Sequence, residues 1–190
     1  FTDLVAEEAV RFIEANRTRP FFLYVPFTAP HSPFQGPNDR QPQPLGADSP
    51  LWNQGKAPPA VYAAMIERMD AAVERILAAL ETRTLTSNTL VVFASDNGGT
   101  ASARNTPLSG TKGSTMEGGI RVPCLARWPG QLPSGLVSEQ VGITMDLTAS
   151  FASLAGVAAP SDSPWDGVDV LALVAARKPP LPRTLFWRGR

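Results

Sequence analysis

Four side chains have the types and the positions in the sequence that chemistry would need: His31, Asp96, Asn97 and Lys112. Asp96 and Asn97 directly follow Leu90–Ala94, an apolar run rich in β-branched residues that predicts a strand buried on both faces. In open α/β sheets, ligands gather at the carboxyl ends of strands. A carboxylate beside an amide suits a hard cation that prefers oxygen ligands. Lys112, set among glycines further along, could meet an anionic group held by that cation.

Each of these residues also has a purely structural interpretation. Asp-Asn-Gly-Gly is favourable turn chemistry without any metal, and a histidine in a proline-rich loop is commonly a hydrogen-bonded surface residue. Lys112 could be a solvated loop lysine. The run at 109–115 superficially suggests a phosphate-binding loop, but that motif requires serine or threonine after the lysine, and here Gly113 follows it.

Three motifs together resemble the sulfatase family within the alkaline-phosphatase-like superfamily. They are the strand that ends in Asp96-Asn97-Gly98-Gly99, the Gly-x-Lys-Gly…Glu-Gly-Gly-x-Arg-Val-Pro run at Gly110–Pro123, and the Pro30-His31-x-Pro33 element upstream. The resemblance runs through nearly the whole chain. From the family pattern we expect residues 1–190 to form the carboxy-terminal part of a catalytic domain. Both ends of the chain are expected to lie inside that domain.

The resemblance implies a sulfuric ester hydrolase and a role for each candidate residue. It makes Asp96 and Asn97 ligands of a divalent cation, Ca²⁺ in most members of the family. It makes Lys112 a positive charge on the sulfate, and His31 a sulfate contact that helps to protonate the leaving oxygen. It also implies a formylglycine nucleophile, made by oxidising a cysteine or serine.

The lone cysteine, Cys124, does not fit that nucleophile. Conversion to formylglycine requires Cys/Ser-x-Pro-x-Arg, but Ala126 and Trp128 occupy the positions of the proline and arginine. We therefore predict that Cys124 is a buried core residue, and that the nucleophile and the remaining metal ligands belong to a segment absent from this chain. Glu117 and Arg121 belong to the lysine-loop signature, but we interpret them as scaffold residues that could pair.

Two other functions stay open at this stage. One is a phosphate or phosphonate ester hydrolase of the same superfamily, and the other is a non-catalytic relative that keeps the fold as a binding module. The substrate could be a sulfated small molecule or a glycan, with specificity depending in part on the polar loop at Gln35–Pro59. The family resemblance implies a periplasmic or secreted enzyme.

Composition narrows the class of protein. Lys+Arg and Asp+Glu each total 17, so net charge gives no indication of a nucleic-acid partner or an acidic membrane surface. No apolar run approaches the roughly 20 residues needed to span a bilayer. One cysteine excludes an internal disulfide framework. The 19 prolines indicate long ordered loops between the regular elements.

The elements that must position the candidate residues follow an alternating pattern. Apolar residues at helical spacing predict helices at Asp3–Asn16 and Pro59–Thr82, and Asp146 is expected to cap a helix at Leu147–Ala155 that Gly156 ends. Strands are predicted at 20–26, 90–94, 122–128, 141–145 and 184–187; residues 168–174 are ambiguous. This alternation predicts an α/β fold with a doubly wound, mostly parallel sheet covered by helices on both faces.

Overall fold

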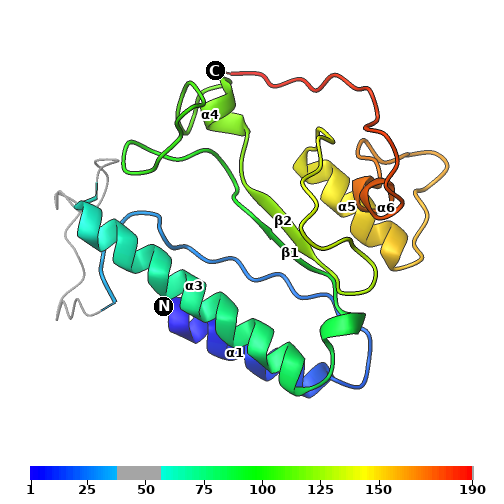
Figure 1. The fold of residues 1–190 in the computed structure, drawn as a ribbon, viewed down its shortest axis with the longest axis horizontal. Helices are drawn as coiled ribbons and strands as arrows, with labels where there is room; N and C mark the ends of the chain where they lie inside the picture. The colour runs from blue at the N-terminus through cyan, green and yellow to red at the C-terminus, as the bar shows by residue number, and fades with distance from the viewer. Residues whose placement is uncertain (38–56, 190) are drawn as a thin grey trace. The chain divides into compact units, whose positions relative to one another are not determined.

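The computed structural model describes residues 1–37 and 57–189, and these residues form two compact units. Unit 1 comprises Phe1–Leu125 with Gly189, and unit 2 comprises Ala126–Arg188. Figure 1 shows the elements with their labels. In chain order they are α1 (Thr2–Asn16), α3 (Pro59–Thr82), the 3₁₀ turn η1 (Thr86–Asn88), β1 (Val91–Ala94), α4 (Glu117–Ile120), β2 (Cys124–Arg127), α5 (Thr144–Leu154) and α6 (Val170–Ala175).

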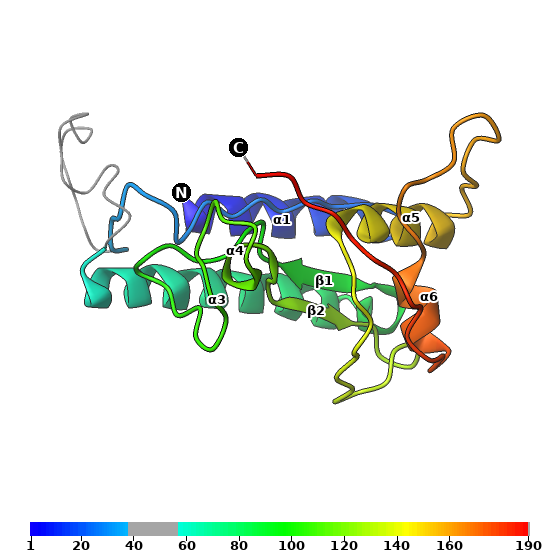
Figure 2. The same ribbon diagram turned by 90° about the horizontal axis from the view of Figure 1, so that it is seen from above.

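Helices α1 and α3 pack along each other in unit 1, as both Figure 1 and Figure 2 show. Each helix buries small and apolar side chains that recur at helical spacing, as the sequence predicted. The buried apolar residues are Ala6, Ala9 and Ile13 on α1 and Met65, Ala72 and Leu80 on α3. Exposed ion pairs join the helices outside this seam, for example Arg68 Nε to Asp3 Oδ1 at 2.8 Å, and such pairs add little to stability.

The strand predicted before Asp96 is present as β1, and it pairs with β2 in a two-stranded sheet. Figures 1 and 2 show the chain passing through β2 in the opposite direction to β1, after a long loop and α4. A doubly wound, mostly parallel sheet is therefore not formed by the described residues. All four residues of β2 are exposed, so this pair of strands lacks the cover that the apolar sequence led us to expect.

Three other predicted strands are not strands in this structure: 20–26, 141–145 and 184–187. In 21–25 the side chains alternate between half-buried and exposed positions, as they would in a strand. A strand also needs a partner for its backbone groups, and no strand of the described chain is paired with this segment. In 144–145 the chain is already helical, because α5 begins at Thr144.

Unit 2 is organised around a fully buried aspartate at the start of α5. Asp146 was expected as the N-cap, but it is the third residue of the helix and its carboxylate reaches back to accept from the Ile143 backbone N–H at 2.8 Å. The same carboxylate accepts from the Val168 N–H at 2.9 Å and from Arg183 Nη1 at 2.7 Å. Gly156 ends the helix with φ +73°, as predicted. The run at 168–174, ambiguous from the sequence, is largely helical and forms most of α6 (Val170–Ala175).

The loop expected to influence specificity, Gln35–Pro59, lies largely outside the described residues. Within the ranges that the structure does describe, no helix has both the length and the apolar content to cross a membrane.

Candidate functional site

Strand β1 delivers the chain to the Asp96–Gly99 turn. The Ser95 hydroxyl donates to the Asn97 carbonyl at 2.9 Å, which fixes the start of this turn. The Asp96 side chain is exposed and Asn97 is half-buried. In the described part of the chain, no ion pair or hydrogen bond engages the Asp96 carboxylate. Its oxygens are thus available to a ligand.

The loop that carries Lys112, residues 109–116 (the lysine loop), is bound directly to this turn. The Lys112 backbone N–H donates to the Gly99 carbonyl at 3.0 Å, and the Gly98 N–H donates to the Gly119 carbonyl at 2.9 Å. The loop is closed further along by the Gly118 N–H, which donates to the Ser109 carbonyl at 2.7 Å. Two motifs that are separate in the sequence therefore form one backbone-bonded cluster, and the exposed Lys112 side chain belongs to it.

Glycines make this close approach possible. A Cβ on Gly98 would lie 1.9 Å from the Gly118 carbonyl oxygen, and one on Gly118 would lie 2.2 Å from the Gly110 carbonyl oxygen. Gly110 itself has φ +89°, in the left-handed region that favours glycine. The tight backbone path expected for the Glu-Gly-Gly signature is confirmed. The expected pairing is also present: Arg121 Nη1 donates to Glu117 Oε2 at 3.4 Å, at the surface.

His31 lies in a turn that its backbone N–H closes by donating to the Thr28 carbonyl at 2.8 Å. Its ring atom Nδ1 is 2.8 Å from the Ser32 carbonyl oxygen. A carbonyl can only accept, so this contact places a hydrogen on Nδ1 and leaves Nε2 for other partners. The ring is exposed.

The extended segment that leads to the His31 turn and strand β1 run in the same direction in Figures 1 and 2, towards the same end of unit 1. No hydrogen bond or ion pair in the described ranges joins His31 to Asp96 or to Lys112. Their convergence on one ligand stays a prediction.

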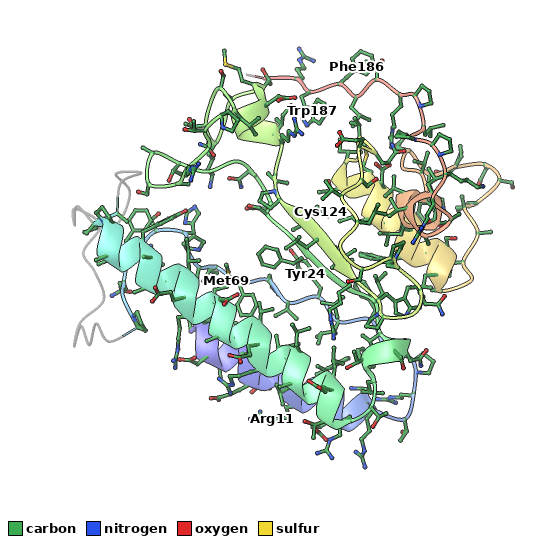
Figure 3. The ribbon with its side chains drawn as sticks, viewed as in Figure 1. Arg11, Tyr24, Met69, Cys124, Phe186 and Trp187 are labelled. Carbon is green, nitrogen blue, oxygen red and sulfur yellow. The ribbon has the colours of Figure 1, made fainter. Side chains whose placement is uncertain are left out.

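Cys124 is not buried, contrary to our expectation. The free thiol is exposed at the start of β2, where Figure 3 labels it. Partial burial by neighbouring atoms still raises the pKa of the Cys124 thiol. The prediction failed because it assumed a sheet covered on both faces, whereas β2 is exposed along its length. A raised thiol pKa does not favour a nucleophile.

Asn105 is a residue that the sequence interpretation missed. Its side-chain Oδ1 accepts from the Gly99 N–H at 3.0 Å, and its Nδ2 donates to the Gly99 carbonyl at 2.9 Å. The only sequence signal was its place before Thr106-Pro107, a turn-forming context that says nothing about a contact with Gly99.

Within the described ranges, no group of three or more His, Cys, Asp or Glu side chains is placed to hold a metal. A cavity of about 600 Å³ lies between α1 and residues 23–26, with an apolar lining that includes Phe1, Phe12 and Tyr24. None of the four candidate residues lines this cavity.

Known proteins similar to this chain identify its family. The sulfatase family model matches residues 1–157. The N-acetylgalactosamine-6-sulfatase of Canis lupus familiaris is 36% identical over 178 residues, which is 90% of this chain and 32% of the relative. The steryl-sulfatase of Mus musculus is 36% identical over 184 residues, 91% of this chain and 27% of the relative. The chain thus spans about a third of the length of such curated relatives.

Solved structures similar to this chain agree with the family match. Ps i-CgsB, crystallised with k-i-k-neocarrahexaose, matches with a TM-score of 0.78 and 34% identity over 93% of this chain and 39% of that one. PsFucS1 sulfatase from Pseudoalteromonas sp. matches with a TM-score of 0.67 and 31% identity over 90% of this chain and 33% of that one. The fold is thus α/β, of the alkaline-phosphatase-like class to which sulfatases belong. Within that class, the chain belongs to the sulfatase family.

Proposed function

We propose that the whole protein hydrolyses sulfate esters, with the cluster around Gly99 as part of its active site. Family membership supports this activity. The observation that carries the proposal is the hydrogen bond from the Lys112 N–H to the Gly99 carbonyl, because it holds an exposed cation beside the turn that presents Asp96 and Asn97. In this proposal the whole protein completes the doubly wound sheet, and the site lies at one edge of that sheet.

Lys112 is the sulfate-binding cation of this proposal. Its side chain is exposed and forms no ion pair with any described residue, so its charge is not neutralised locally. A lysine ammonium is a compact point charge, and its attraction for the sulfate oxygens increases as negative charge develops during S–O cleavage.

Asp96 and Asn97 are the proposed cation ligands. They supply carboxylate and amide oxygens, which are the donors that Ca²⁺ prefers, but they fall short of the 6–8 that it takes. Further ligands must come from elsewhere in the whole protein. When bound, such a cation holds an anionic substrate and stabilises negative charge.

The nucleophile lies outside this chain in our proposal. The formylglycine that family membership suggests requires the Cys/Ser-x-Pro-x-Arg motif, and Cys124 does not fit it. We therefore assign no nucleophilic role to any residue of 1–190.

His31 is the proposed general acid. Because Nδ1 is engaged by the Ser32 carbonyl, Nε2 is the atom that would give a proton to the leaving oxygen. General acid catalysis contributes about 10²–10⁴ in rate. We expect His31→Ala to slow esters of weakly acidic alcohols most and activated aryl sulfates least, measured as kcat/KM across leaving groups of graded pKa. A loss that stays constant across the series would leave His31 as a sulfate-positioning contact only.

For the substrate, we propose a sulfated carbohydrate. The relatives include an N-acetylgalactosamine-6-sulfatase, and the similar Ps i-CgsB was crystallised with k-i-k-neocarrahexaose. A steryl-sulfatase is equally similar in sequence, so a steryl sulfate is the comparison substrate for the test.

The test is a hydrolysis assay of the whole protein against sulfated oligosaccharides, steryl sulfate, an aryl sulfate and the matching aryl phosphate. We expect sulfate release that falls at least 10²-fold in Lys112→Ala and is unchanged in Lys178→Ala, an exposed lysine in unit 2. Faster hydrolysis of the phosphate would favour a phosphoesterase. Hydrolysis of neither ester would favour a non-catalytic binding protein.

A further inference from the structure

The carbonyl oxygen of Gly99 accepts two hydrogen bonds from separate parts of the chain. One comes from the Lys112 backbone N–H at 3.0 Å and the other from Asn105 Nδ2 at 2.9 Å. The Gly99 N–H is used as well, because it donates to Asn105 Oδ1 at 3.0 Å. All the hydrogen-bonding groups of this one peptide residue are thus engaged, and a single side chain makes two of the three bonds.

The Asn105 amide pairs with Gly99 as a neighbouring strand residue would. The two bonds also fix which end of the amide is which, because turning it over would set a donor against the Gly99 N–H and an acceptor against the Gly99 carbonyl. Its own backbone is held too: the Leu108 N–H donates to the Asn105 carbonyl at 2.8 Å. A Cβ on Gly99 would lie 2.9 Å from Asn105 Oδ1 and 2.3 Å from the Ala103 Cβ, so any larger residue at position 99 would displace Ala103 and the Asn105 amide.

Gly99 lies two residues after Asn97 and three after Asp96. Its position sets where the preceding turn presents its oxygens, and the shared carbonyl links that position to the start of the lysine loop. We propose that Asn105 is a positioning residue that fixes the spacing between the Asp96–Asn97 pair and Lys112. The catalytic consequence of this inference rests on the proposed function. Its geometric part, that the Asn105 side chain holds Gly99 in place, does not.

The expected size of the effect follows from comparable sites. Residues that orient metal ligands without touching the metal typically change metal affinity or activity by about 10–100-fold when they are removed. Asn105→Ala removes both side-chain bonds and leaves Gly99 with the Lys112 bond only. We expect weaker Ca²⁺ binding and lower kcat, with the fold kept, because the remaining bonds of the cluster are between backbone groups.

The first measurement is amide hydrogen exchange at Gly99 in the whole protein. In Asn105→Ala we expect the Gly99 N–H to exchange at least about tenfold faster than in the wild type. The matched control is Asn88→Ala, an exposed asparagine on η1, which should leave Gly99 unchanged. Exchange within twofold of wild type in Asn105→Ala would show that the side chain does not hold Gly99, and would overturn the proposal.

The second measurement is calorimetric titration of the whole protein with Ca²⁺ alone, alongside kcat and KM for a sulfate ester. We expect the Ca²⁺ dissociation constant to rise and kcat to fall by about tenfold or more in Asn105→Ala. Faster Gly99 exchange with unchanged Ca²⁺ affinity and unchanged kcat would make Asn105 a purely structural residue, which also overturns the proposal. A wild-type protein that hydrolyses no sulfate ester would instead refute the proposed function, and the Gly99 exchange would still decide the geometric part.

Asn105→Asp keeps the proposal testable if Asn105→Ala does not fold. The ionised carboxylate can accept from the Gly99 N–H, but it faces the Gly99 carbonyl without a proton to donate. Protonation restores that donor. We therefore expect Gly99 protection in Asn105→Asp, relative to wild type at the same pH, to improve as the pH falls through the titration of the introduced carboxyl. Protection that does not change with pH would contradict the two-bond arrangement.

Discussion

Gly98→Ala tests whether the backbone contact between the Asp96–Gly99 turn and α4 holds the cluster together. The new Cβ would lie 1.9 Å from the Gly118 carbonyl oxygen and 2.7 Å from Gly119 Cα. Both are backbone atoms, so no side-chain rotation relieves the clash. The two segments must separate by about 1.5 Å to restore an ordinary contact. The backbone at Gly98 is not in the left-handed region, so lack of space is the only obstacle to alanine.

The loss of stability expected in Gly98→Ala has two parts. Overpacking a tightly packed position typically costs about 1–3 kcal/mol. A separation of this size also breaks the 2.9 Å bond from the Gly98 N–H to the Gly119 carbonyl, which adds about 1 kcal/mol. We therefore expect Gly98→Ala to lower the free energy of unfolding by about 2–4 kcal/mol.

The assay is urea-induced unfolding of the wild-type protein and two variants. Gly36→Ala is the matched control, because a Cβ there meets nothing within 4 Å and Gly36 has no positive φ. It should change stability by less than about 0.5 kcal/mol. If Gly98→Ala is as stable as Gly36→Ala, then the turn and α4 are not in contact as the structure shows, and the cluster that joins Lys112 to Gly99 is not packed as described.

Three further predictions concern other parts of the chain. Burial acts to raise the pKa of Asp146, but the hydrogen bonds from Arg183 and from backbone N–H groups outweigh it and lower that pKa below the ordinary 3.8. Asp146→Asn should therefore lower the free energy of unfolding by about 3–5 kcal/mol near neutral pH. In acid unfolding curves this difference from the wild type should shrink below pH 3.8, as the wild-type carboxylate takes up its proton. Glu117→Gln should change the unfolding free energy by less than about 1 kcal/mol, because its partner Arg121 is exposed and the pair spans 3.4 Å. Cys124→Ala should keep the full rate of sulfate release in the hydrolysis assay, since the nucleophile motif is not present around this residue.

The helices of unit 1 could be predicted because their signal is local. The apolar stripes of α1 and α3 occur within each segment, and both helices end where the periodicity ends. The run before Asp96 was equally clear. The segment at 20–26 has the side-chain alternation of a strand, but strand formation depends on a partner that local sequence does not specify. The same dependence explains why Cys124 was placed in a core that the two-stranded sheet does not build.

The candidate site shows the same division between local and tertiary information. The sequence singled out Asp96 and Lys112 by type, and family resemblance supplied their roles. Neither the sequence nor the resemblance indicated that the Lys112 N–H would donate to the Gly99 carbonyl, or that Asn105 would share that carbonyl. Both contacts end on the Gly99 carbonyl, a backbone group that every residue possesses, and they join residues 6 and 13 positions apart. The residue type at position 99 therefore carries no record of its partners.

Different residues of the cluster hold it together and face the ligand, so substitutions can separate the two roles. Backbone hydrogen bonds and glycine contacts hold the turn, the lysine loop and α4 together, whereas the side chains of Asp96 and Lys112 are exposed and take no part in that packing. Replacing either side chain should therefore remove a ligand contact at little cost in stability. Replacing a packed glycine should lower stability and disturb the site together. Measuring stability and activity on the same variants separates the residues that act on the ligand from those that hold them in place.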